Sequence, residues 1–336
     1  MRLDGFDAAA VERAAELLAA GELVALPTET VYGLGARADD DAAVTKIFRA
    51  KGRPENHPLI VHLAEPAQVA HFAAETSAVA RRLIDAFWPG PLTVILARAD
   101  GVAAAAAGQQ RSIGLRCPSH PVARELLAAA QRLGVPGVAA PSANRFGRVS
   151  PTRAAHVADE FGATLLVLDG GDCEVGIESS IVDCSRGHPV LLRPGVLTRA
   201  RLEAATGEPL AAPDLAAPRA PGTLAAHYAP NAKLRLMSAR KLTEALQLLG
   251  PGPLKLAVYS RGPLPDAAGN VQHRRMPALP EQAAHELFSV LREFDAQGVE
   301  LIWVEAPPPD AAWDGVRDRL LRAAVAHPQP AGFSEH

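Results

Sequence analysis

A proline-rich stretch just past the middle of the chain is the feature that most restricts its fold. Residues 208–230 contain five prolines among many alanines. Proline fixes φ and has no amide hydrogen, so neither a helix nor a central strand continues through such a stretch. We therefore predict a linker at residues 207–232 between two domains, residues 1–206 and residues 233–336. A chain of 336 residues is long enough for about two domains.

The region before the linker alternates short apolar runs, typical of strands, with longer amphipathic segments, typical of helices. The expected strands are residues 22–26, 59–63, 92–97, 112–116, 137–140, 164–168, 180–183 and 190–192. The expected helices are residues 7–20 with Asp7 as the cap, 40–50, two stretches that end near 88–90, 121–132 and 153–161. Several expected strands are separated only by loops, so the pattern predicts an α/β fold with a mixed sheet packed by helices.

The region after the linker shows the same alternation on a smaller scale. The expected strands are residues 234–237, 254–259 and 299–305, and the expected helices are residues 239–249, 281–294 and 311–326. This pattern predicts a small C-terminal α/β domain of Rossmann-like type.

Charge and cysteine content exclude several classes of protein. Lysine and arginine number 34 and aspartate and glutamate 37, a net charge of −3, so the overall field favours neither nonspecific nucleic-acid binding nor membrane binding. The three cysteines, Cys117, Cys173 and Cys184, have no CxxC spacing and predict neither a disulfide framework nor a zinc site. Acidic residues interrupt the N-terminal segment, which is typical of an amphipathic helix and not of a signal peptide. We expect a cytoplasmic protein.

The first candidate functional segment is Pro27–Gly35, with the sequence PTETVYGLG. It follows an expected strand, and loops that leave strand ends are where α/β proteins bind ligands. Its hydroxyl groups, on Thr28, Thr30 and Tyr32, are suited to a polar ligand. The alternative interpretation is an ordinary turn between a strand and a helix.

The second candidate segment runs from Lys51 through Arg53 to His57 and leads into the strand that holds His62. A point charge beside a planar guanidinium suits a phosphate chain. The alternative is that these cations only stabilise the carbonyl end of a helix. For His62 the alternative is a buried core histidine with its hydrogen bonds satisfied.

The third candidate segment is Ser142-Ala143-Asn144, again after an expected strand. Side chains alternate along a strand, so Ser142 and Asn144 are expected on one side. Arginines follow at 145, 148 and 153, and Thr152 is a ligand residue or the cap of the next helix. No Walker loop, GxGxxG, HExxH or GxSxG occurs. The three segments together favour an anionic ligand, with phosphate as the best candidate.

Further short segments follow in order: Ser112–Pro118, Glu178–Asp183 and Arg193-Pro194-Gly195. With the first three segments they resemble the threonylcarbamoyl-AMP synthases of the YrdC-like fold, six motifs over about 200 residues. The long members of that family carry a linker and a C-terminal domain. Here the linker segment, Ala220–Pro230, shares the PG and HYAP parts of the family motif but departs from it at Ala220, Thr223 and Leu224, and Phe146 stands where a serine is common.

The resemblance implies a YrdC-like mixed, twisted sheet and a nucleotidyltransferase activity. The implied substrates are L-threonine, bicarbonate or CO2, and ATP, with Mg²⁺ on the ATP, and the products are threonylcarbamoyl-AMP and pyrophosphate. The adenylate would feed N6-threonylcarbamoyladenosine formation at position 37 of tRNA. A separate tRNA threonylcarbamoyl-transferase system performs that transfer, so stable nucleic-acid binding is not required of this chain, and neither is a membrane.

The resemblance also implies site residues. Catalysis would rest on Lys51 and Arg53. The residues expected to hold L-threonine are Thr30, His62, Arg116, Ser142 and Ser179. The residues expected to contact ATP are Lys51, Arg53, His57, Ser112, Asn144, Thr152, Arg193 and Tyr228. His227 and Tyr228 form a lid over the site or only brace the two domains, and no metal site built by the protein is expected.

Three other interpretations compete with this one. An RNA-binding module could use the same basic loops, but a net charge of −3 and only three tyrosines argue against it. A carbamoyl-transferring maturation enzyme would need an acylphosphatase-like segment and zinc-finger cysteines, and the sequence shows neither. A purely structural regulator would not bind ATP.

Overall fold

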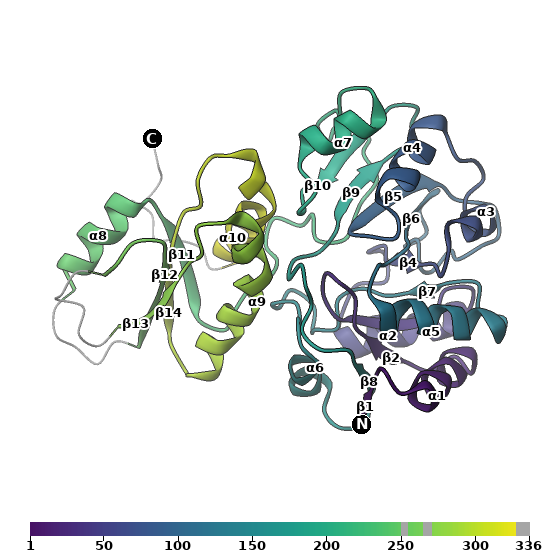
Figure 1. Ribbon diagram of the computed structural model, residues 1–336, viewed down its shortest axis with the longest axis horizontal. Helices are drawn as coiled ribbons and strands as arrows, with labels where there is room; N and C mark the ends of the chain where they lie inside the picture. The colour runs from purple at the N-terminus through teal and green to yellow at the C-terminus, as the bar shows by residue number, and fades with distance from the viewer. Residues whose placement is uncertain (250–254, 265–270, 327–336) are drawn as a thin grey trace. The chain divides into compact units, whose positions relative to one another are not determined.

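The computed structural model describes residues 1–249, 255–264 and 271–326 (Figure 1). The chain forms two compact units. The first unit comprises Met1–Phe146 and Ser150–Thr223, and the second comprises Gly147–Val149 and the chain from Leu224 onward. The division between Thr223 and Leu224 falls within the stretch where the prolines predict a linker.

A ten-stranded mixed sheet forms the centre of the first unit. Its strands are β1 (Arg2–Asp4), β2 (Val24–Leu26), β3 (Gly33–Arg37), β4 (Ile60–His62), β5 (Leu92–Ala97), β6 (Ser112–Arg116), β7 (Val138–Ala139), β8 (Leu166–Asp169), β9 (Ser180–Asp183) and β10 (Val190–Arg193). Their spatial order is β1-β8-β2-β3-β7-β4-β6-β5-β9-β10. Pairs such as β4–β6 are parallel while β5–β6 and β3–β7 are antiparallel, which confirms the expected mixed α/β sheet.

Helices cover both faces of this sheet. They are α1 (Ala8–Ala19), α2 (Asp41–Lys51), α3 (Val69–Phe72), α4 (Ala78–Phe87), α5 (Pro121–Arg132), α6 (Ala154–Phe161) and α7 (Arg199–Thr206), with a short 3-10 turn, η1 (Pro66–Gln68). Asp7 caps α1 as expected, accepting a hydrogen bond from the Ala9 amide at 3.0 Å. Along β2, Val24 and Leu26 pack in the cluster with α1 and α5, whereas Ala25 joins the cluster with α2 and α4.

Two strands of this sheet were not predicted. β1 has only three residues, lies at the sheet edge beside β8, and has no apolar pattern. β3 contains Gly33 and Gly35, and two glycines so close together are typical of a turn. A Cβ at Gly35 would lie 2.9 Å from the Cγ1 of Val138, so this glycine permits close strand packing instead.

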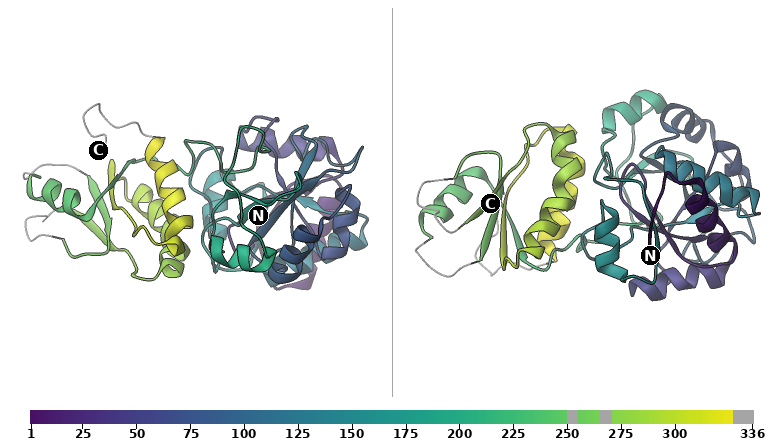
Figure 2. Two further views of the ribbon diagram at one scale, coloured as in Figure 1. Left: turned by 90° about the horizontal axis from the view of Figure 1, so that it is seen from above. Right: turned by 60° about the horizontal axis from the view of Figure 1, so that its bottom comes forward.

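The second unit contains a four-stranded parallel sheet in the order β11-β14-β12-β13. Its elements are β11 (Lys233–Met237), α8 (Ala239–Gln247), β12 (Leu256–Ser260), β13 (Gln272–Arg275), α9 (Pro280–Ala296), β14 (Leu301–Glu305), η2 (Ala311–Trp313) and α10 (Asp314–Val325). Figure 2 shows α8 on one face of this sheet and α9 and α10 on the other. β13 was not predicted because all four of its side chains are polar and exposed. Leu254, the start of one expected strand, and residues 327–336 lie outside the described residues.

Within the described ranges, none of the helices combines the length and the apolar character that a bilayer crossing requires.

Candidate functional site

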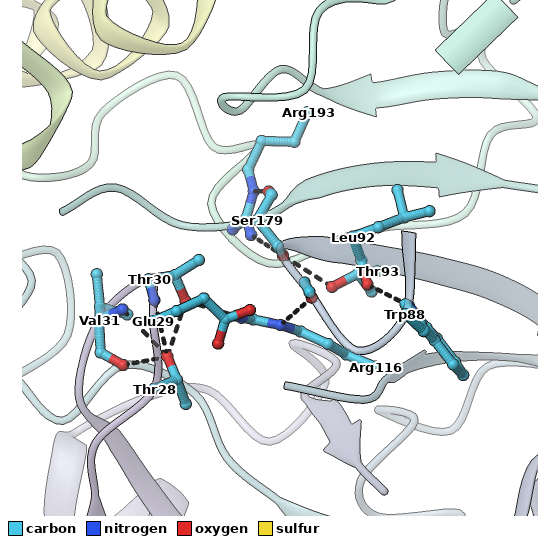
Figure 3. A network of polar contacts seen from close by, with 11 residues as sticks. Thr28, Glu29, Thr30, Val31, Trp88, Leu92, Thr93, Arg116, Ser179 and Arg193 are labelled. Atoms are coloured by element: carbon cyan, nitrogen blue, oxygen red, sulfur yellow. Dashed lines mark hydrogen bonds and ion pairs between the residues drawn. The ribbon is translucent and has the colours of Figure 1, made fainter. Parts of the chain in front are cut away.

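The loop between β2 and β3 presents a chain of hydroxyl groups that ends on an arginine (Figure 3). The Thr28 hydroxyl donates to the Val31 carbonyl at 2.6 Å, and the Thr28 and Thr30 hydroxyls lie 2.9 Å apart. Arg116 Nη1 donates to Thr30 Oγ1 at 2.8 Å. Since the hydrogen of Thr28 is committed to Val31, the Thr30 hydroxyl donates to Thr28. Thr30 therefore keeps one lone pair for a ligand.

Arg116 ends β6 and is almost completely buried. Its Nε donates to the Gly90 carbonyl at 3.2 Å, and its Nη2 lies 2.7 Å from the Glu29 carboxylate. His62, at the end of β4, is the register partner of Arg116 across the β4–β6 pair. Burial and the Arg116 charge lower the pKa of His62 to about 3, so its imidazole is neutral near pH 7.

The turn after α2 orients two of the predicted cations. Gly52 adopts the left-handed conformation, with φ at 63°, and the Arg53 amide donates back to Phe48 at 3.0 Å. Lys51 is buried, and its Nζ donates to the Ser142 carbonyl at 2.6 Å and to the Asn144 carbonyl. Burial, and secondarily the Arg53 charge, lower the pKa of Lys51 well below its ordinary 10.5.

Phe146 contacts two of the residues predicted to bind ATP. The Arg53 guanidinium lies 5.6 Å from the centre of the Phe146 ring, and the His57 ring meets it edge-on with centres 5.4 Å apart. Arg53 Nη2 also donates to the Pro58 carbonyl at 2.8 Å. Burial, then the charge of Arg53, lower the pKa of His57 below 6.5. The phenylalanine that departs from the family pattern therefore helps to fix both side chains.

Ser179 and Arg193 form a second buried cluster, also visible in Figure 3. Arg193 donates through Nε to the Ser179 carbonyl at 3.0 Å and through Nη2 to the Ser179 hydroxyl at 3.2 Å. The hydroxyls of Thr93 and Ser179 lie 2.8 Å apart. Gly195 makes this arrangement possible, because a Cβ there would lie 2.5 Å from the Ser180 amide nitrogen.

Residues 219–221, near the end of the first unit, are hydrogen-bonded to Gln110 in the loop before β6 and to Arg193 on β10. The Gln110 side-chain amide donates to the Arg219 carbonyl at 3.1 Å, and the Arg219 amide donates to Gln110 Oε1 at 2.9 Å. Arg193 Nη1 donates to the Pro221 carbonyl at 2.9 Å. Ser112 lines a small recess with Thr93 and with this segment.

Thr152 does not cap the next helix, which was the alternative to its ligand role. Arg153 occupies the cap position of α6 without a side-chain cap bond. The Thr152 amide donates to His156 Nδ1 at 3.3 Å, and its carbonyl accepts from the Cys173 amide at 3.0 Å. Arg153 pairs with Asp172 at 3.0 Å, so its charge serves the local structure.

Most predicted residues lie in the first unit in groups that share contacts. Thr30 contacts Arg116, Lys51 contacts the backbone of Ser142 and Asn144, and an isolated bridge pairs Ser142 with Gly33. The three candidate segments are therefore neighbours in space. Tyr32 is architectural, because its hydroxyl donates to the Gly171 carbonyl at 2.8 Å and burial raises its pKa.

His227 and Tyr228 belong to the second unit. Tyr228 is fully buried, stacks on Phe288 with ring centres 5.5 Å apart, and lies 5.4 Å from the Arg319 guanidinium carbon. The ring of His227 meets Tyr228 edge-on, with centres 4.1 Å apart.

Two residues of the site were not singled out from the sequence, Glu29 and Thr93. Glu29 stands inside the first candidate segment, and its position between two threonines in a polar loop was a usable signal. Thr93 lies within a strand of apolar neighbours and gave no signal of its own.

Comparisons with known proteins cover nearly the whole chain. The family described as "Telomere recombination" (Sua5, YciO and YrdC proteins) matches residues 16–195, and the family "Threonylcarbamoyl-AMP synthase, C-terminal domain" matches residues 197–325. The threonylcarbamoyl-AMP synthase of Pyrococcus abyssi is 37% identical over 323 residues, 93% of each chain. The Bacillus subtilis enzyme is 36% identical over 324 residues, 94% of this chain and 92% of its own.

A solved structure, P. abyssi Sua5 complexed with L-threonine, superposes with a TM-score of 0.87 at 35% identity and covers 97% of both chains. Both parts of the chain and their order are thus matched in full-length relatives. The expected fold, a YrdC-like mixed sheet followed by a small α/β domain, is confirmed. The chain belongs to the Sua5-type threonylcarbamoyl-AMP synthases, with a YrdC domain followed by the Sua5 C-terminal domain.

Proposed function

We propose that the first unit joins L-threonine, bicarbonate or CO2, and ATP into threonylcarbamoyl-AMP and pyrophosphate. The observation that carries this proposal is the juxtaposition of Arg116 and Thr30 with the Lys51 turn through the Gly33–Ser142 bridge. Such an arrangement offers cations and hydroxyls to two anions at once. The adenylate would then serve a tRNA threonylcarbamoyl-transferase system.

The amino-acid half of the site is proposed to consist of Thr30, His62, Arg116, Ser142 and Ser179. The guanidinium of Arg116 suits a carboxylate, which it would bind by charge-assisted hydrogen bonds worth roughly 1.5–3 kcal/mol each. A neutral His62 can accept or donate one hydrogen bond without adding a second positive charge beside Arg116.

The nucleotide half is proposed to consist of Lys51, Arg53, His57, Ser112, Asn144, Thr152 and Arg193. Lys51 and Arg53 are the proposed catalytic residues, because they would offset charge on the phosphates as pyrophosphate leaves. Mg²⁺ is proposed to arrive on the ATP, held by phosphate oxygens and water. Among the residues that the structure describes, no three His, Cys, Asp or Glu side chains gather as a metal site.

The proposed chemistry needs no protein nucleophile. The amine of threonine captures CO2 as a carbamate, and a carbamate oxygen attacks the α-phosphorus of ATP. The pyrophosphate leaves in line with the incoming oxygen. The protein's contribution is to hold two anions close together in the right orientation and to offset their repulsion.

We propose a cytoplasmic setting, which suits three cysteines that are all buried and free.

Pyrophosphate release from ATP tests the proposal. We expect release to require both L-threonine and bicarbonate, and release that persists when either is omitted would contradict the proposed reaction.

Arg53→Ala should reduce turnover at least a hundredfold with little change in melting temperature. Arg49→Ala, at an exposed position in the last turn of α2, is the matched control and should retain full turnover. A large fall in melting temperature for Arg53→Ala would mean that Arg53 is architectural.

A further inference from the structure

Glu29 has a buried carboxylate that the proposed reaction does not yet use. The residue is only 2% exposed, and its Oε1 lies 2.7 Å from Arg116 Nη2. Among the described residues, neither carboxylate oxygen accepts a hydrogen bond. A buried carboxylate normally accepts several hydrogen bonds, because leaving one unsatisfied is costly. The Glu29 carboxylate can therefore accept hydrogen bonds from a ligand.

Arg116 has a hydrogen-bond donor that complements these acceptors. Its Nε and Nη1 donate to Gly90 and Thr30, while its Nη2 makes no hydrogen bond to any described residue. The contact between Nη2 and Glu29 is close, yet its geometry is not that of a hydrogen bond. The pair thus leaves a donor on Arg116 beside two acceptor oxygens on Glu29.

The net charge of this pair decides which ligand suits it. Glu29 already neutralises Arg116, so a ligand with only a carboxylate would bring a second buried negative charge. A free α-amino acid brings a carboxylate and an ammonium a few ångströms apart, and it adds no net charge. A zwitterion can satisfy both members of the pair at once.

We propose that Glu29 binds the α-ammonium of the amino-acid substrate while Arg116 Nη2 binds its carboxylate. This inference rests on the proposed function, because it assigns to Glu29 one half of the threonine site. It makes the Glu29–Arg116 pair a selector for free α-amino acids over hydroxy acids, which lack the ammonium group. The alternative is that Glu29 is a positioning residue that only orients Arg116.

The test compares two ligands on the unmodified full-length chain and on variants of it. The ligands are L-threonine and (R)-3-hydroxybutanoate, which keeps the carboxylate and the hydroxyl but lacks the amino group. Affinities are measured by ligand-observed NMR, which detects weak binding. We expect Glu29→Gln to weaken L-threonine binding at least tenfold and to leave the binding of 3-hydroxybutanoate unchanged or tighter. Glu125→Gln, an exposed glutamate on α5, is the matched control and should change neither affinity.

The outcomes separate this inference from the proposed function. An equal loss of both ligands in Glu29→Gln would show that Glu29 only orients Arg116, and would overturn the inference alone. Failure of the unmodified chain to bind L-threonine would overturn the proposed function as well. If Glu29→Gln folds poorly, Glu29→Asp replaces it in the test. This variant keeps the charge but retracts it by one methylene, so it should retain part of the preference for L-threonine. Loss of that preference in a folded Glu29→Asp variant, judged by ATP binding, would also count against the inference.

Discussion

The site depends on side chains whose hydrogen bonds each have a fixed direction. Arg116 donates to Thr30, Thr30 to Thr28, and Thr28 to the Val31 carbonyl. Each hydroxyl orientation is therefore set before any ligand arrives. Such preorganisation reduces the entropy that binding must spend on ordering the site.

His62 makes the stability of the first unit depend on pH. Its pKa is about 3 in the folded chain and near 6.5 in the unfolded chain, because burial and Arg116 disfavour the imidazolium. Between these values the unfolded state binds more protons, so the free energy of unfolding falls as the pH drops from 6.5 toward 3. The slope from this one group is up to about 1.4 kcal/mol per pH unit.

We expect His62→Gln to flatten that acid-side slope. The measurement is urea unfolding at several pH values between 4 and 7, analysed as the difference from the unmodified chain. His188→Gln, at an exposed position, is the control and should leave the slope unchanged. Identical slopes for the unmodified chain and His62→Gln would refute the assignment of a neutral, buried His62.

Much of the candidate site could be named from the sequence, whereas Thr93 could not be named for a physical reason. Lys51, Arg116 and Ser142 stand in segments with a distinctive order of polar residues, and the structure brings these segments together. The ligand roles assigned to them stay predictions. Thr93 could not be found, because its partner Ser179 is 86 positions away and no local pattern records that contact.

Among the elements of the first unit, three strands were predicted to the residue. The structure gives β5 as Leu92–Ala97, β6 as Ser112–Arg116 and β9 as Ser180–Asp183, the same bounds that the sequence predicts. α5 likewise begins at Pro121, a favoured first helical residue, and ends at Arg132. The missed strands β3 and β13 are specified by partner strands and by glycine packing, which a local pattern does not contain.

The loop after β10 packs closely on the start of β9 at Gly195. A Cβ at this position would lie 2.5 Å from the Ser180 amide nitrogen, and a backbone atom cannot move aside cheaply. We expect Gly195→Ala to lower the free energy of unfolding by about 1–3 kcal/mol, as overpacking does. Thermal unfolding measures the change. Gly262→Ala, where a Cβ meets nothing within 4 Å, is the control, and equal melting temperatures for both variants would contradict the packing argument.

The side chain of Gln110 holds residues 219–221 against the rest of the first unit. Its side-chain amide makes two hydrogen bonds to the Arg219 backbone, and each contributes roughly 0.5–1.5 kcal/mol. We expect Gln110→Ala to speed hydrogen exchange of the Arg219 amide at least fivefold while exchange in α1 stays the same. Gln131→Ala, at an exposed position, should have no effect. Unchanged exchange at Arg219 in the Gln110 variant would show that other contacts hold the segment.

At the scale of the whole molecule, the second unit takes in a short piece of chain from the middle of the first. Gly147–Val149 belongs to the second unit although residues on both sides of it belong to the first. The five prolines predicted a linker at residues 207–232, but no local signal indicated that residues 147–149 belong with the second unit. This grouping depends on contacts between residues about 80–150 positions apart, such as the Arg148–Ala229 bridge and the Arg148–Asp295 pair.

Asp295 on α9 holds two separate pieces of chain in the second unit. Its carboxylate accepts hydrogen bonds from the Asn231 and Ala232 amides at 2.7 and 3.0 Å, and it lies 3.7 Å from Arg148. We expect Asp295→Ala to lower the free energy of unfolding by about 1–3 kcal/mol, because it leaves two amides without their acceptor. Differential scanning calorimetry measures the loss. Glu300→Ala, an exposed acidic residue nearby in sequence, is the control, and a similar loss in both would indicate a general effect of charge removal.

The three buried cysteines have a practical consequence. Burial raises the pKa of Cys117 to about 11 and that of Cys184 to about 12, and it also raises the pKa of Cys173. Thiolates are the reactive form, so alkylating reagents should modify the native chain only when it opens. Every cysteine lies in the first unit, and residues 224–336 contain none. Thiol labelling followed by mass spectrometry therefore reports the opening of the first unit separately from the second, without any engineered probe.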